Sequence, residues 1–188
     1  MSSLPLPVLF LDFDRTLFDT EKFYAWLGPD RYAGILALMS GEREEPDYAQ
    51  FLYADAIPFL TAMHKKYRLV ILSYAVNVLS QRRKIRGTGV TPFFDDILIT
   101  GQQKGIAAKT YLSQFHLSGW RHVFVDDVQE HLVNMKKENP SIFTVYIDRT
   151  TAKVLPSRGM SLLFDEMVFS LTDLQDILLE LKSGEGKL

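Results

Sequence analysis

The 188-residue sequence contains no cysteine, which excludes disulfide bonds, thiolate metal sites and a cysteine nucleophile. It has no apolar run close to the roughly 20 residues that a membrane span needs. Its first apolar stretch follows no basic segment and ends in an aspartate, so we expect no signal peptide. The net charge is only −2, and such a charge creates no field that would recruit nucleic acid or an acidic membrane. These absences favour a cytoplasmic location and a single soluble domain.

Five short apolar runs are present, and they do not alternate with polar residues. Such runs are typical of strands buried on both faces of a parallel sheet. Helical patterns lie between them, most clearly where Leu174, Ile177, Leu178 and Leu181 recur at helical spacing. We therefore predict an α/β fold with a parallel five-stranded sheet. The five predicted strands are Val8–Leu11, Leu69–Leu72, Ile97–Ile99, Val123–Val125 and Phe143–Ile147.

About forty residues without a strand pattern separate the first strand from the helix that starts near Pro58, which is long for a connection. Within them, Glu21–Leu27 and Asp30–Met39 have helical patterns. We predict that residues 20–50 form a small helical cap over one end of the sheet. Residues 1–19 and 51–188 would then form the core domain.

Polar side chains follow the strands at the point where each strand ends. Asp12 and Asp14 follow the first strand, and Asp126 and Asp127 close the fourth. The carboxyl ends of parallel strands meet at one edge of a sheet, so these four carboxylates should converge. Carboxylates that lie close together repel one another, which costs free energy unless a cation is bound. Oxygen ligands favour Mg²⁺, and the coordination shell of Mg²⁺ usually includes a substrate phosphate.

Ser73 ends the second strand and Lys104 lies just beyond the third. A hydroxyl, an ammonium and a metal ion together form a receptor for a phosphoryl group, and a carboxylate at its centre can act as a nucleophile. Lys109 competes with Lys104 for this role, and we favour Lys104 because Gly105 and a helix follow it directly. The basic run Gln81–Arg86 is typical of the solvated face of a helix, which we predict here, and polyanion binding is the alternative. The histidines are expected to lie on the surface or in packing.

Four motifs resemble those of the haloacid dehalogenase superfamily and follow one another in the same order along the chain. They are "DFDRT" (Asp12–Thr16), "LVILS" ending at Ser73, the lysine of "GQQKG" (Lys104) and "VFVDD" ending at Asp127. The resemblance covers nearly the whole chain. It implies a Rossmannoid three-layer sandwich, and an aspartate at the second acidic position implies the phosphatase branch.

The resemblance also implies roles. Asp12 would attack phosphorus and form an aspartyl-phosphate, while Asp14 would protonate the leaving oxygen and then activate water. Ser73 and Lys104 would hold the phosphate oxygens. The implied Mg²⁺ ligands are the Asp12 side chain, the Asp14 backbone carbonyl and Asp127, with Asp126 assisting.

Two positions depart from the family pattern: Arg15 stands where many members have glycine, and His131 where a further acidic or amide residue is common. The reaction we predict is Mg²⁺-dependent hydrolysis of a phosphate monoester. Phosphotransfer through the same intermediate and a non-catalytic scaffold protein are the alternatives.

The cap is too short to seal the site, so we expect an open site that accepts a larger leaving group, although a homodimer could supply a roof. Tyr24 or Trp26 would stack on the leaving group, with Arg15 or Arg82 near its charges. Phe23, Tyr24 and Trp26 could instead pack the cap onto the core.

Overall fold

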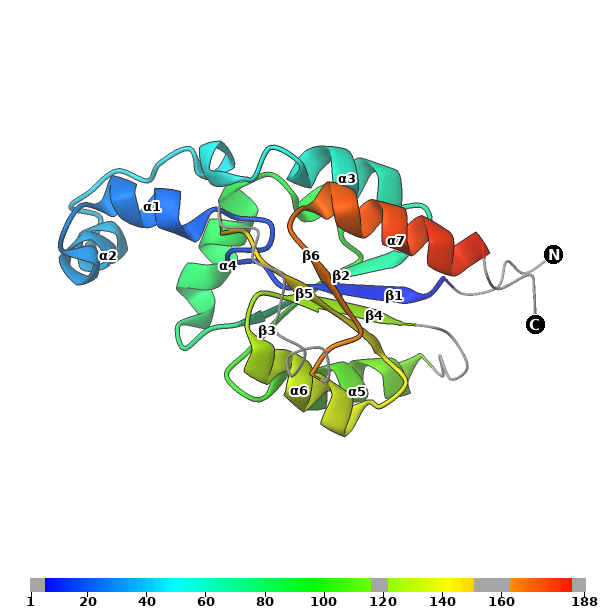
Figure 1. The fold of residues 1–188 in the computed structure, drawn as a ribbon. Coiled ribbons are helices and arrows are strands. Elements are labelled where there is room, and N and C mark those ends of the chain that lie inside the picture. The colour runs from blue at the N-terminus through cyan, green and yellow to red at the C-terminus, as the bar shows by residue number, and fades with distance from the viewer. Residues whose placement is uncertain (1–5, 116–121, 151–162, 184–188) are drawn as a thin grey trace.

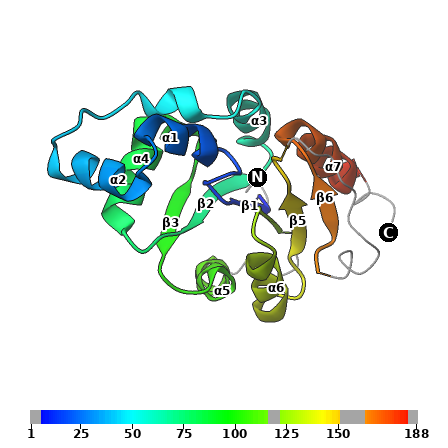
Figure 2. The same cartoon turned by 60° about the vertical axis from the view of Figure 1, so that its left-hand side comes forward.

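The protein is described here by a computed structural model that covers residues 6–115, 122–150 and 163–183. At its centre lies a six-stranded sheet in the order β3-β2-β1-β4-β5-β6, with every neighbouring pair parallel (Figures 1 and 2). The strands are β1 (Val8–Leu11), β2 (Arg68–Tyr74), β3 (Asp96–Thr100), β4 (Val123–Asp126), β5 (Phe143–Ile147) and β6 (Glu166–Val168). The predicted α/β fold class is confirmed.

The predicted number of strands is wrong by one, because β6 was not recognised. This edge strand has three residues and begins with a glutamate, so it contains no apolar run of detectable length. It pairs with β5 between Val145↔Glu166 and Ile147↔Val168. Its place in the sheet therefore depends on its neighbour rather than on its own sequence pattern.

Helices cover both faces of the sheet and complete the three layers (Figure 1). Leu9 and Leu11 of β1 belong to the hydrophobic cluster on the side of α3, α4 and α7, whereas Val8 and Phe10 belong to the cluster under α5 and α6. Successive side chains of a strand point to opposite faces, so a strand covered on both sides is apolar throughout. The helices are α3 (Ala56–Met63), α4 (Val78–Gly87), α5 (Lys104–Gln114), α6 (Gln129–Glu138) and α7 (Leu171–Ser183). None of the helices in the described ranges is long and apolar enough to cross a membrane.

The segment between β1 and α3 is helical, as the sequence predicts. It contains α1 (Thr20–Leu27), α2 (Arg31–Ser40) and the 3₁₀ helix η1 (Tyr48–Phe51), and α1 and α2 lie beyond one end of the sheet (Figures 1 and 2). The Asp19 and Asp30 side chains accept hydrogen bonds of 2.9 Å from the Lys22 and Ala33 backbone N–H groups, which fixes where α1 and α2 begin. The buried apolar side chains of this segment join the cluster that includes β1; they are Phe23, Leu27, Leu38, Tyr48 and Phe51. The division into a cap and a core domain stays a prediction.

Candidate active site

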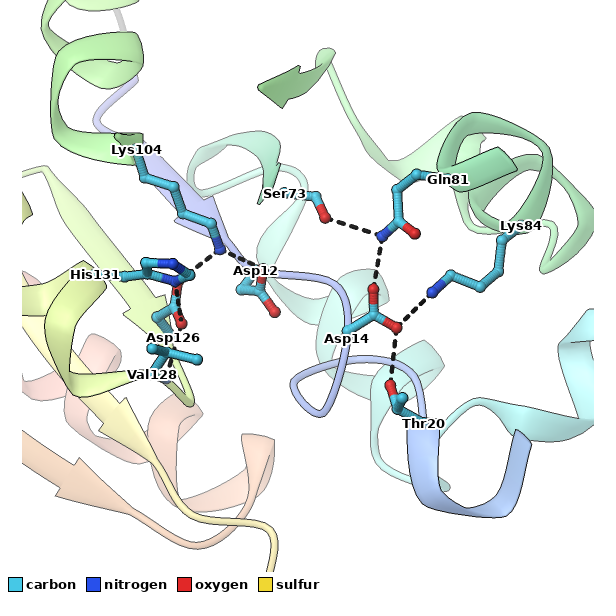
Figure 3. A network of polar contacts seen from close by, with 10 residues as sticks. All are labelled: Asp12, Asp14, Thr20, Ser73, Gln81, Lys84, Lys104, Asp126, Val128 and His131. Carbon is cyan, nitrogen blue, oxygen red and sulfur yellow. Dashed lines mark hydrogen bonds and ion pairs between the residues drawn. The ribbon is translucent and has the colours of Figure 1, made fainter. Parts of the chain in front are cut away.

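Lys104 lies at the centre of the predicted site and is almost fully buried, with 1% of its side chain exposed. Its Nζ forms an ion pair with Asp12 Oδ1 and another, of 2.7 Å, with Asp126 Oδ2 (Figure 3). Lys109 lies elsewhere: 64% of its side chain is exposed, and it pairs with Glu138 at 3.5 Å. Of the two candidate lysines, the structure therefore brings Lys104 to the carboxylates.

The position of Lys104 depends on close packing between α5 and α6. Its neighbour Gly105 donates its N–H to Asn134 Oδ1 at 2.8 Å, and Gly105 O accepts a hydrogen bond of 2.8 Å from Asn139 Nδ2. A Cβ atom at Gly105 would lie only 2.7 Å from the Asn134 backbone oxygen. A glycine is required at this position because the two helices touch there, which explains the lysine-glycine pair in the sequence.

Asp126 is fully buried, and both of its carboxylate oxygens are hydrogen-bonded. Besides Lys104, Oδ1 accepts from the Val128 backbone N–H at 2.9 Å, and His131 Nδ1 lies 3.1 Å from both oxygens. The expectation that every histidine is a surface or packing residue is therefore wrong for His131, which contacts a site carboxylate. It is correct for His122, whose Nδ1 accepts the Val8 backbone N–H at 3.1 Å inside the core.

Asp12, Asp126 and Asp127 each place a carboxylate oxygen within 4.8 Å of the others. Burial, reinforced by the charge of Asp126, raises the pKa of Asp127 to about 6. Burial also raises the pKa of Asp12, against the opposing effect of Lys104. Burial alone would raise the pKa of Asp126 as well, but Lys104, most strongly, and His131 outweigh it, so the pKa of Asp126 is lowered. Three carboxylates held this close are suited to a hard divalent cation, which offsets their repulsion. The donor set thus fits the Mg²⁺ that the sequence predicts.

Mg²⁺ binding to this cluster is expected to weaken as the pH falls below about 6. Asp127 must lose its proton to bind a metal ion, and its pKa is raised to about 6, so each further pH unit should increase the apparent Kd for Mg²⁺ about tenfold. Asp127→Asn should weaken binding and reduce this dependence, and Asp12, whose pKa burial also raises, should account for the part that remains. Isothermal titration calorimetry with Mg²⁺ between pH 5 and 8 measures it, and an unchanged Kd over that range would contradict the assignment.

Asp14 belongs to a second polar network, and no side-chain hydrogen bond among the described residues joins it to the Lys104 network (Figure 3). Asp14 accepts hydrogen bonds from Thr20 Oγ1 at 2.8 Å, Gln81 Nε2 at 2.7 Å and Lys84 Nζ at 2.5 Å. Burial alone would raise the pKa of Asp14, but these partners outweigh it, Lys84 most strongly, so this pKa is lowered. Gln81 Nε2 also donates to Ser73 Oγ at 2.9 Å and so connects Ser73 to Asp14.

The basic run Gln81–Arg86 is part of α4, and the prediction that it is a solvated helix face is wrong for three of its residues, one of which is Ile85 in the hydrophobic core. Gln81 is buried, and only 14% of the Lys84 side chain is exposed. Both face the site because they lie about one helical turn apart on α4. Charge and composition alone could not distinguish this inward side from the outward side, on which Arg86 is exposed.

A cavity of about 390 Å³ lies between the α1–α2 segment and α4, with Asp14 in its lining. Arg15 and Tyr24 line it, as predicted, but Trp26 and Arg82 do not. Trp26 stacks on Phe23 with ring centroids 6.0 Å apart, and the Arg43 guanidinium lies 3.8 Å from the centroid of the indole ring. Trp26 therefore packs within the segment of α1 and α2, and Arg82 lines a separate depression along β3.

No protein-family model and no curated protein matches the sequence. Solved structures match over nearly the whole chain. A haloacid dehalogenase-like family hydrolase from Xanthomonas campestris has a TM-score of 0.69 at 13% identity and covers 99% of this chain and 100% of its own. The HAD-hydrolase YfnB from Bacillus subtilis, bound to magnesium, has a TM-score of 0.65 at 15% identity, and the match covers 93% of this chain and 99% of YfnB. The 2-haloacid dehalogenase from Pseudomonas syringae has a TM-score of 0.61 at 13% identity, covering 94% and 99%.

These matches define the architecture of the chain. It has the haloacid dehalogenase-like fold, as the four motifs suggested, with Asp12, Lys104 and Asp126 in contact at the carboxyl ends of the central strands.

Proposed function

We propose that the protein is a hydrolase of the haloacid dehalogenase superfamily that cleaves phosphate monoesters with Mg²⁺. The observation that carries this proposal is the pairing of two different carboxylate environments. Asp12 lies in a buried cluster with Asp126, Asp127 and Lys104, whereas Asp14 lies in a separate network with Lys84. A nucleophile and a proton-transfer group need such distinct surroundings.

In the first step, an Asp12 carboxylate oxygen attacks phosphorus, and the bond between phosphorus and the leaving oxygen breaks. The leaving oxygen keeps the electron pair and takes a proton from the Asp14 carboxyl group. Because the pKa of Asp14 is lowered, this proton comes from the Lys84 ammonium, which forms an ion pair with Asp14 and passes the proton on through its carboxylate. Lys84 is then neutral, and it regains the proton that Asp14 accepts in the second step. Ser73 and Lys104 would hold the phosphate oxygens, and Mg²⁺, when bound, would neutralise charge on the phosphoryl group.

In the second step, Asp14 accepts a proton from water as the water oxygen attacks phosphorus. The bond between phosphorus and the Asp12 oxygen breaks, releasing inorganic phosphate and restoring the carboxylate. The lowered pKa of Asp14 suits this step, because it keeps the acceptor ionised. Asp12, Asp14 (through its backbone carbonyl) and Asp127 would ligate the metal. Asp126 would support the metal site indirectly, because both of its carboxylate oxygens already accept hydrogen bonds from protein groups.

Asp14 also favours phosphate esters over haloacids as substrates. A halide leaves as a stable anion and needs no proton donor, whereas an alkoxide leaving group does. Thr20, Gln81 and Lys84 all position the Asp14 carboxylate, an arrangement that a dehalogenase would not require.

Hydrolysis of an activated aryl phosphate, with and without Mg²⁺, tests this proposal. We expect turnover that EDTA abolishes and excess Mg²⁺ restores, and no halide release from 2-chloropropionate in the same buffers. Ca²⁺ should inhibit, because its looser coordination shell lets Asp12 bind with both oxygens instead of attacking phosphorus. Full activity in EDTA, or halide release without phosphate ester cleavage, would contradict the proposal. Transfer of phosphate to added alcohols in place of water would favour a phosphotransferase.

A further inference from the structure

The cavity beside Asp14 is placed to receive the leaving group of a substrate rather than its phosphoryl group. Asp14 lines the cavity, whereas Asp12, Ser73 and Lys104 do not. In the proposed function Asp14 gives its proton to the leaving oxygen, so the part of the substrate beyond that oxygen extends into this space. At about 390 Å³ the cavity can hold a substantial organic group.

One wall of the cavity is apolar and comes from the cap. Phe23, Leu38 and Tyr48 are buried in the hydrophobic cluster, so this wall is fixed by packing. Tyr48 also lies against α4, where a Cβ atom at Gly87 would come within 2.4 Å of its ring. The apolar and aromatic residues contributed by the cap are Phe23, Tyr24, Ile35, Leu38, Met39 and Tyr48.

The rest of the lining is polar: it includes Thr20, Asn77, Ser80 and Gln81, together with three cations that each have their own carboxylate. Arg15 pairs with Glu21 at 2.8 Å, Arg83 with Glu45 at 3.0 Å and Lys84 with Asp14 at 2.5 Å. No lysine or arginine that lines the cavity in the described part of the chain is left without an acidic partner. A second anionic group on the leaving group would therefore have to displace an existing ion pair, and the cavity favours an uncharged one.

We infer that the substrate is a phosphate monoester of an uncharged, predominantly apolar alcohol or phenol that fills this cavity. The inference rests on the proposed function and adds the chemical class of the leaving group. Sugar phosphates, nucleotides and bisphosphates have polar or charged leaving groups, and those of their polar groups that face the apolar wall would be unpaired. The polar side chains Asn77, Ser80 and Gln81 can meet only the groups on their own side of the cavity.

A series of n-alkyl monophosphates from ethyl to octyl tests the inference, because these primary alcohols are leaving groups of nearly equal basicity. We expect kcat/KM to rise up to about fourfold for each added methylene until the cavity is full, the gain that burial of a methylene provides. Glycerol phosphate, glucose 6-phosphate and a nucleoside monophosphate should be poorer than the hexyl ester.

Two neighbouring residues of α2 provide a matched pair of variants. Ile35 lines the cavity, whereas Leu36 is exposed and does not. Ile35→Asn should flatten the rise along the alkyl series, and Leu36→Asn should keep it. If Ile35→Asn lowers the melting temperature too far for assay, Met39→Gln changes an exposed lining residue instead and should act in the same direction.

The outcomes separate this inference from the proposed function. Acetyl phosphate, whose small leaving group does not fill the cavity, reports on the chemistry alone. If acetyl phosphate is cleaved but the alkyl series shows no rise, or polar esters are preferred, the inference is overturned and the proposed function stands. If no phosphate compound is cleaved, the proposed function fails. A rise along the series that Ile35→Asn or Met39→Gln removes supports the inference.

Discussion

Asp12→Asn should reduce turnover of a phosphate ester by at least about 10⁴-fold, because an amide oxygen cannot form the acyl-phosphate. Asparagine has nearly the same shape, and Asp12 lies in a cluster whose carboxylates repel one another. The fold should therefore survive the change, and the melting temperature should not fall by more than a few degrees. Steady-state kinetics with saturating Mg²⁺ and a thermal melt measure the two effects.

Asp30→Asn is the matched control for this substitution. Asp30 is an exposed N-cap of α2 outside the cavity, and asparagine caps a helix as well as aspartate does. The control should retain full activity. Turnover by Asp12→Asn within tenfold of the control would exclude Asp12 as the nucleophile.

Lys104→Met should cause the largest loss of stability in the site. Methionine fills most of the volume but leaves the buried carboxylates of Asp12 and Asp126 without the ammonium that both contact. Removal of one partner of a buried ion pair typically costs about 3–5 kcal/mol of the free energy of unfolding. Chemical denaturation in EDTA measures this loss, and Mg²⁺ should restore part of it because the ion also neutralises the carboxylates.

Lys109→Met is the control on the same helix, since its exposed ion pair with Glu138 should contribute little. Adding Asp126→Asn to Lys104→Met should recover part of the lost stability, because it removes one of the two unpaired charges. If Lys104→Met and Lys109→Met had the same free energy of unfolding, the buried ion pairs of Lys104 would contribute no more to stability than the exposed pair of Lys109. That result would contradict the prediction.

The sequence predicted the residues that lie at the ends of strands better than those that reach the site from helices. Asp12 and Asp126 could be brought together from the sequence, because the geometry of a parallel sheet fixes where strand ends converge. Lys104, the first residue of α5, could be added because it follows the end of β3 by only four residues. His131 and Lys84 could not, since their positions depend on how α6 and α4 pack against the sheet. A helical wheel of Gln81–Arg86 places Gln81 and Lys84 on one side, but it does not show which side faces inward.

The helices of residues 20–50 were predicted, but their contacts were not, and their division from the core as a cap stays a prediction. Helix boundaries there follow from local signals, namely the capping aspartates Asp19 and Asp30 and the glycine at position 28. Which aromatic residue faces the cavity is a matter of tertiary packing. Trp26 turns towards Arg43, and Tyr24 lines the space that both were expected to share.

The most direct test of the central claim is to locate the phosphoryl group on the protein during turnover. Asp14→Asn removes the group that activates water, so the variant, incubated with Mg²⁺ and acetyl phosphate and quenched in acid, should accumulate a phosphorylated form. Peptide mass spectrometry should place one phosphoryl group on Asp12, and hydroxylamine should remove it, as expected for an acyl-phosphate. A label on another residue, or no label in a variant that still cleaves acetyl phosphate, would contradict the account.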